Sequence, residues 1–177
     1  MRGGSHNLVL GRMNQYASFG GLIHGLNNTV LNAEGAVIAG SNNVVSGVRS
    51  AVLGGDQNTA SGNKVVVVGG VQNEAKGSVA IVLGGSENTA DGTATTIAGG
   101  ALNQTLGTQT TVVGGGLNIG DGYRGVVAGG ESNQTASSES GYTSVFGGRY
   151  NMGGDYCGAI LGGYAAAGAA AVRVGDG

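Results

Sequence analysis

One asparagine frame repeats every fifteen residues along most of the chain, and this period limits the possible folds more than any other feature. A typical copy, such as 52–62, has a β-branched residue, a glycine pair, two variable residues, the asparagine, and a glycine four positions later. A fixed period of this length is typical of stacked structural repeats. The frame asparagines, the last after a longer step, are Asn28, Asn43, Asn58, Asn73, Asn88, Asn103, Asn118, Asn133 and Asn151.

The composition favours a folded repeat protein over a disordered chain. The 177 residues include 40 glycines and no proline, but 40% are hydrophobic and the net charge is −2, whereas disorder needs low hydrophobicity and high net charge. The eight basic residues are scattered singly, so we expect no nucleic-acid partner. No apolar run approaches the roughly 18 residues that span a bilayer, so we expect no membrane insertion by this segment.

A β-branched residue recurs before the glycine pair, which favours strand over helix. A unit of fifteen residues is too small to bury its own apolar face and must stack on its neighbours. We therefore predict an all-β fold, a parallel β-solenoid of about eleven coils, with the asparagine amides bonded in a ladder along the stack. The predicted core column is Val37, Val52, Val67, Val82, Ile97, Val112 and Val127.

The period divides the chain into two parts and contains one break. Residues 1–163 are predicted to form the solenoid repeats, and 164–177 a terminal coil and tail in which Ala166 takes the asparagine slot. Between Asn133 and Asn151 the step lengthens to eighteen residues, which predicts an irregular insertion at about 134–142 that leaves the rod. The candidate ligand-contact residues of this loop are Ser137, Ser138, Glu139 and Tyr142.

The residues on both sides of the core column are also largely apolar. Ala51, Val66 and Ile81 precede it, and Leu53 and Val68 follow it. Successive strand residues point to opposite faces, so both faces of this strand need cover, which a slim solenoid cannot supply from its own chain. We therefore predict a homo-oligomer packed along this strand.

The glycine four positions after each asparagine is predicted to adopt a left-handed turn. Its slot holds Asn32 in an early coil, and asparagine is the residue other than glycine that best tolerates positive φ. The glycines in question are Gly47, Gly62, Gly77, Gly92, Gly107 and Gly122.

The sequence offers no catalytic or metal-binding constellation. His6 and His24 are the only histidines and have no matched nucleophile motif, and Cys157 is the only cysteine. The turn carboxylates, such as Asp56 and Asp91, fall at different slots of the repeat. We expect a non-enzymatic protein with no metal site and no cofactor.

The run Gly-Ser-Val-Ala-Ile at 77–81, followed by Gly84, and the recurring Asn-x-Ala-x-Gly resemble the head repeats of YadA-like trimeric autotransporter adhesins. The resemblance covers about residues 8–163. It implies a left-handed parallel β-roll in a homotrimer, located at the cell surface or outside the cell. It also implies attachment to a host extracellular-matrix protein or a surface glycan, with an anchor that is not in this chain.

Two other functions are compatible with the repeat. A phage tail-fibre or extracellular filament module would use the same rod as a structural element. An ice-binding solenoid would need a regular row of threonines; Thr95-Thr96 and Thr110-Thr111 match in adjacent coils, but Ser50, Val65 and Ala80 interrupt the row.

Overall fold

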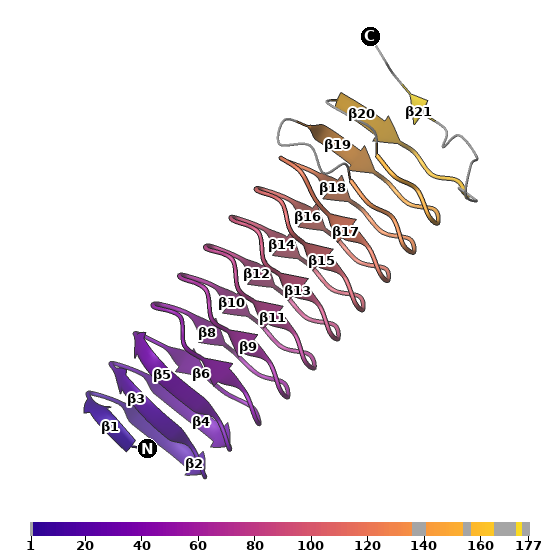
Figure 1. Cartoon of the computed structure of the whole chain (residues 1–177). Helices are drawn as coiled ribbons and strands as arrows, with labels where there is room; N and C mark the ends of the chain where they lie inside the picture. Colours follow the sequence, from indigo (N-terminus) through magenta and orange to yellow (C-terminus); the bar gives the residue numbers. More distant parts are fainter. Residues whose placement is uncertain (1, 136–140, 154–156, 165–172, 175–177) are drawn as a thin grey trace.

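The computed structural model of the chain describes residues 2–135, 141–153, 157–164 and 173–174, and these form a rod of stacked coils (Figure 1). The described residues form strands and turns without a helix, in a parallel β-solenoid of about ten turns. The all-β class and the parallel solenoid are therefore confirmed, with about ten turns where we expected eleven. The terminal coil predicted at Ala166 lies outside the described residues.

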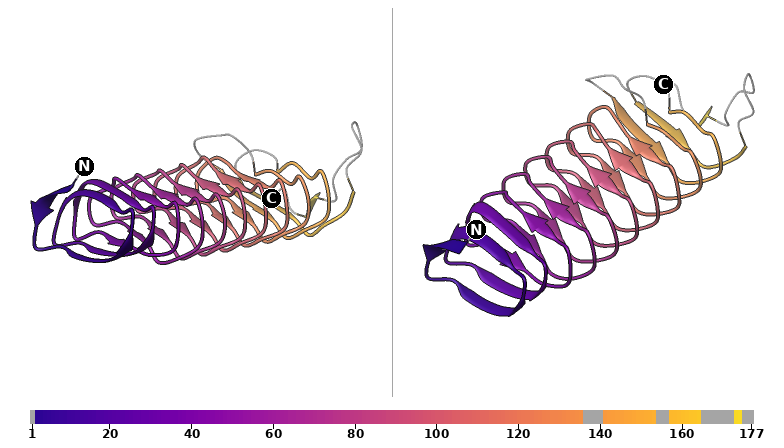
Figure 2. Two further views of the ribbon diagram at one scale, coloured as in Figure 1. Left: turned by 90° about the horizontal axis from the view of Figure 1, so that it is seen from below. Right: turned by 60° about the horizontal axis from the view of Figure 1, so that its bottom comes forward.

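From the N-terminal end to β17, each coil gives one short strand to each of two sheets, and the second sheet continues beyond the end of the first (Figure 2). The first sheet has nine strands, and every neighbouring pair in it is parallel. In spatial order they are β1 (Arg2–Ser5), β3 (Gln15–Phe19), β5 (Thr29–Glu34), β7 (Val44–Val45), β9 (Thr59–Ala60), β11 (Glu74–Ala75), β13 (Thr89–Ala90), β15 (Gln104–Thr105) and β17 (Ile119–Gly120).

The second sheet has twelve strands, parallel except for the last pair, β20 and β21, which is antiparallel. In spatial order they are β2 (Leu8–Arg12), β4 (Leu22–Leu26), β6 (Val37–Ile38), β8 (Ala51–Val52), β10 (Val66–Val67), β12 (Ile81–Val82), β14 (Thr96–Ile97), β16 (Thr111–Val112), β18 (Val126–Val127), β19 (Tyr142–Val145), β20 (Cys157–Ile160) and β21 (Arg173–Val174).

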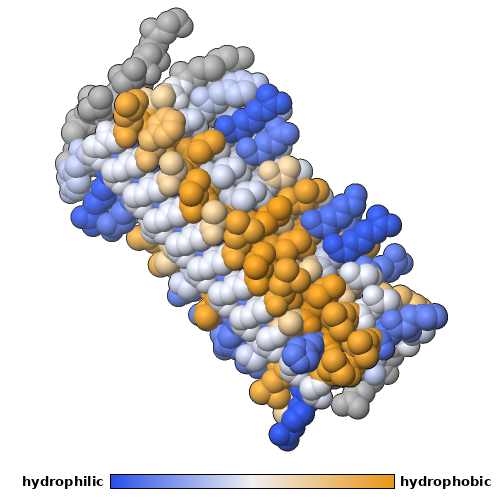
Figure 3. Space-filling view, turned by 180° about the vertical axis from the view of Figure 1, so that it is seen from behind, coloured by the Kyte–Doolittle hydropathy of each residue, from blue (hydrophilic) through white to orange (hydrophobic). Residues whose placement is uncertain are grey.

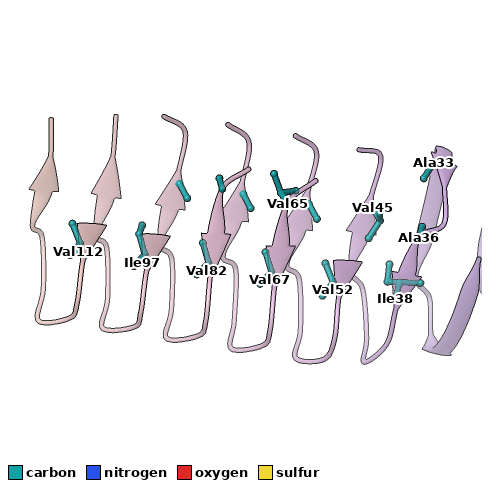
Figure 4. Close-up of a cluster of buried hydrophobic side chains, with 14 of the residues drawn as sticks. Ala33, Ala36, Ile38, Val45, Val52, Val65, Val67, Val82, Ile97 and Val112 are labelled. Carbon is teal, nitrogen blue, oxygen red and sulfur yellow. The ribbon is translucent and has the colours of Figure 1, made fainter. Parts of the chain in front are cut away.

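The core contains a column of β-branched side chains from the second sheet, one in each coil, which packs against buried residues of the other sides of the coil (Figure 4). Val52, Val67, Val82, Ile97, Val112 and Val127 are buried in it, together with Ile23, Ile38, Val145 and Ile160. Small residues of the first sheet, such as Ala60, Ala75 and Ala90, are buried in the same core. Valine and alanine fit because a fifteen-residue coil encloses space for little more than one layer of side chains.

The assignment of Val37 to this column is wrong. Val37 pairs with Ala51 and is only half buried, whereas Ile38 pairs with Val52 and is fully buried. The segment from Ile38 to Asn43 is one residue shorter than the matching segment of the next coil. Counting back fifteen residues from Val52 therefore reaches Val37, the neighbour of the core residue Ile38.

The prediction of left-handed turns at the glycine after the asparagine is also wrong for five of its six members. Only Gly122 has a positive φ, of 77°; Gly77 and its other counterparts do not. Asn32 is left-handed because it lies at a bulge in the pairing of β3 with β5. Its conformation therefore does not extend to the glycines that occupy the same slot in later coils. The left-handed residues lie two positions later, with φ of 56–60°: Arg49, Lys64, Val79, Ala94, Gln109 and Arg124.

Glycine is required at this slot because the next coil approaches too closely for a side chain. A Cβ at Gly77 would lie 1.9 Å from the carbonyl oxygen of Gly92 and 2.4 Å from that of Asp91. Both oxygens belong to the backbone of the next coil, whose distance is fixed by the strand spacing. The slot is therefore set by contact between coils.

Candidate functional site

The repeated asparagines form a buried ladder along the rod. Asn73 is typical: its Nδ2 donates to the carbonyl oxygens of Gly69 (3.0 Å) and Gly85 (2.9 Å), and its Oδ1 accepts from the backbone N–H of Asn88 (3.1 Å). The side-chain oxygen of the previous asparagine accepts the backbone N–H of Asn28, Asn43, Asn58, Asn73, Asn88, Asn103, Asn118, Asn133 and Asn151. The amides are thus used within the stack and are buried, and only the Oδ1 of Asn151, at the last rung, has no partner among the described residues.

The outward face of the second sheet carries a largely apolar surface, which we call the apolar band. Figure 3 shows an apolar strip that follows the rod axis. The relative exposure of its large side chains is high, for example 50% for Leu53, 48% for Leu83 and 49% for Val113. The band consists of Ala51, Leu53, Val66, Val68, Ile81, Leu83, Thr96, Ala98, Thr111, Val113, Val126 and Ala128.

The outward face of the first sheet is polar by comparison. Its central strands expose or half-expose Thr59, Glu74, Thr89 and Gln104, and Glu74 forms an ion pair with Lys76. From β2 to β18 the two sheets are built by the same coils. The contrast therefore reflects the choice of residue, and only one of the two faces is apolar.

The turn next to the asparagine displays variable side chains at regular spacing. The residue before each frame asparagine is left-handed, with φ of 57° at Gln57 and 55° at Glu87. Contacts between coils use some of these side chains: Asp56 Oδ1 accepts hydrogen bonds from Asn42 Nδ2 (2.7 Å) and Ser41 Oγ (2.8 Å). These bonds hold the pKa of the Asp56 carboxyl below its usual value.

The predicted loop at 134–142 is shorter at both ends than expected. Gln134 and Thr135 still belong to the coil, since Gln134 pairs with Ile119 and Thr135 is buried. Tyr142 lies in β19, opposite Cys157 of β20, and not in a loop. The strand that follows the lengthened step is longer than those of the regular coils, and all four of its residues pair in register with β20. Ser137, Ser138 and Glu139 lie outside the described residues.

Beside this break, four side chains gather on the turn edge of the rod; we call them the Tyr–Arg cluster. Arg124 Nε donates to Gln109 Oε1 (2.8 Å), and its Nη1 donates to Tyr142 Oη (3.0 Å). The Arg124 Cζ lies 4.8 Å from the ring centre of Tyr123 and 5.4 Å from that of Tyr142. The two rings meet edge to face, with centres 6.1 Å apart.

A second group of the same residue types lies at the turn next to the asparagine. Arg149 Nη2 donates to Glu131 Oε1 (3.1 Å) and to Tyr150 Oη (3.3 Å), and its Cζ is 4.8 Å from the Tyr150 ring centre. Tyr150 meets Tyr164 edge to face at 5.9 Å. The negative charge of Glu131 raises the pKa of Arg149. This arginine is therefore paired with a carboxylate of its own chain.

Our sequence reasoning missed these two groups, although the sequence contained a signal for them. No aromatic residue occurs between Phe19 and Tyr123, whereas five of the six tyrosines lie within 123–164. Apart from Tyr16 and Phe19 near the start of the chain, the tyrosine and phenylalanine residues thus lie in the segment around and after the break. The fifteen-residue frame concealed this because aromatic side chains occur only at variable slots.

The described residues hold no group of three or more histidine, cysteine, aspartate or glutamate side chains that could bind a metal ion. No helix among them is long and apolar enough to cross a membrane. Thr95 and Thr110, which we considered for an ice-binding row, are buried, so they add nothing to an exposed row.

In comparisons with known proteins, no family model matches the chain, and no curated protein matches it at a significant level.

Proposed function

We propose that this chain is the non-enzymatic head of a cell-surface adhesin, a rigid homotrimeric rod that presents turn residues to a host or matrix surface. The apolar band is the observation that carries the proposal. Exposed leucines and valines form a row along one face, next to a polar second face. Soluble monomers expose single apolar side chains, but rarely a contiguous apolar patch of this extent. Packing against identical chains would bury the apolar side chains of every coil, since the same repeat occurs along each chain.

The number of chains and the left-handed winding in this proposal come from the resemblance to YadA-like heads. The attachment role is supported by the difference between the structural positions of the repeat and its variable, exposed positions. Asparagine, glycine and β-branched slots are used for hydrogen bonds and contacts between coils, so sequence variation falls on the exposed turns. The proposed partner is a host extracellular-matrix protein or a surface glycan.

Beads coated with the intact chain test this function. We expect them to attach to cultured animal cells, whereas beads coated with a chain lacking Ser137, Ser138 and Glu139 should attach at least about tenfold less. That deletion restores the fifteen-residue step between frame asparagines, so the thermal unfolding midpoint should stay unchanged.

Two outcomes contradict parts of this proposal. If coated beads attach no better than bare beads, the adhesive function is wrong, and a filament or tail-fibre module becomes the better interpretation. If the deletion variant attaches as well as the intact chain, the adhesive contacts lie elsewhere on the rod.

A further inference from the structure

The Tyr–Arg cluster has a composition that the rod does not need for its own stability. The regular coils between Phe19 and Tyr123 stack without any aromatic side chain. We propose that Gln109, Tyr123, Arg124 and Tyr142 form a binding site for an acidic saccharide, a sugar ring that carries a carboxylate. The inference rests on the proposed adhesive function and specifies the chemical class of its ligand.

The charge of Arg124 is uncompensated among the described residues. Its guanidinium has five N–H donors, of which one on Nε and one on Nη1 are used. No carboxylate in the described ranges forms an ion pair with it, and its Nη2 group has no hydrogen-bond partner there. Three N–H groups therefore remain, one on Nη1 and two on Nη2, and they can donate to the carboxylate of a ligand.

The two rings add a surface that fits a sugar better than a peptide. Tyr142 is 47% exposed, so part of its ring is open to a ligand. The C–H face of a sugar ring stacks on an aromatic ring, and its hydroxyls bond to planar groups such as the Gln109 amide and the phenol oxygens. An acidic peptide can also pair with the arginine and hydrogen-bond to the amide and the phenols, but its acidic side chain has no C–H ring face that stacks on the tyrosine.

The site is also held in place before a ligand binds. Arg124 has a left-handed backbone, with φ of 56°, and its N–H donates to the carbonyl oxygen of Thr108 (2.9 Å). Its side chain is fixed by Gln109 on one side and Tyr142 on the other. Immobilisation of a long side chain before binding removes much of the entropy cost of binding.

The Arg149 group provides an internal comparison. It has the same edge-to-face tyrosine pair and the same arginine above a ring, but the Glu131 carboxylate already bonds to its Nη2. The chain itself thus shows that an arginine beside an edge-to-face tyrosine pair donates a hydrogen bond to a carboxylate. Arg149 is therefore a matched control that should not contribute to binding of an external acid.

The test is calorimetric titration of the intact chain with sialyllactose, lactose and an acidic tetrapeptide. We expect sialyllactose to bind with a dissociation constant of about 1 mM or tighter, and at least about tenfold tighter than the other two. Arg124→Gln should remove this binding, and Arg149→Gln should leave it unchanged. The Arg124→Gln chain should fold, because Gln109 occupies the equivalent left-handed position with φ of 58°.

Equal affinity for lactose and sialyllactose, tighter binding of the peptide, or unaltered binding in Arg124→Gln would overturn the inference. The bead assay separates this failure from failure of the adhesive function. Attachment to cells by beads of a chain that binds no sialyllactose would reject only the saccharide site. Saccharide binding by a chain whose beads do not attach would support the site and reject the adhesive function.

Discussion

The Gly77→Ala variant is expected to lose more than about 4 kcal/mol of folding free energy, or to fail to fold. Its new Cβ would lie 1.9 Å from the backbone oxygen of Gly92, and no flexible side chain could move to make room. The next coil would have to shift away, which would break parallel strand pairing on both sides of the turn. Urea unfolding followed by circular dichroism measures the loss.

Gly69→Ala is the matched control for this variant. An added Cβ there meets nothing within 4 Å, and the backbone of Gly69 is not left-handed. We expect its folding free energy to change by less than about 0.5 kcal/mol. If both substitutions destabilise the chain equally, close approach between coils is not the reason for glycine at position 77.

The Asn73→Ala variant is expected to lose about 3 kcal/mol of folding free energy. The substitution removes both donor bonds of the amide and leaves the buried backbone N–H of Asn88 without its acceptor. The Asn88 Nδ2, which also donates to Asn73 Oδ1 (3.0 Å), loses that partner too. Because neighbouring coils share these bonds, hydrogen exchange should increase at Asn88 and in the adjacent coils.

Gln72→Ala serves as the control, since Gln72 is the exposed neighbour in the same turn. Its left-handed backbone is compatible with alanine, as Ala94 has φ of 56°. We expect a change of no more than about 0.5 kcal/mol. A similar small change in Asn73→Ala would mean that the ladder is not a principal source of stability.

The fifteen-residue period was sufficient to predict the class of fold, because a strict period forces equivalent residues to stack. It could not assign Val37 correctly. In that coil the segment before the strand is one residue longer and the segment after it one residue shorter, so the spacing of the asparagines stays at fifteen while the strand shifts by one residue. It also could not show why Gly77 is glycine. A positive φ and a close approach of the next coil both select glycine, and only the three-dimensional structure distinguishes these two causes.

The candidate site was less predictable than the fold. The loop residues Ser137, Ser138 and Glu139 follow from the break in period alone, but Tyr142 belongs to a strand that the period did not indicate. The Tyr–Arg cluster joins residues from successive coils, 15 and 18 positions apart. Such contacts arise from stacking, so they are visible only after the register is known.

The central claim, that identical chains cover the apolar band, is tested most directly by the mass of the intact chain in solution. Static light scattering should give a particle of three times 17.1 kDa. Leu83→Glu, at an exposed position in the band, should reduce that mass towards 17.1 kDa. A stable particle of 17.1 kDa for the unmodified chain would contradict the account, because the apolar band would then face water in the native protein.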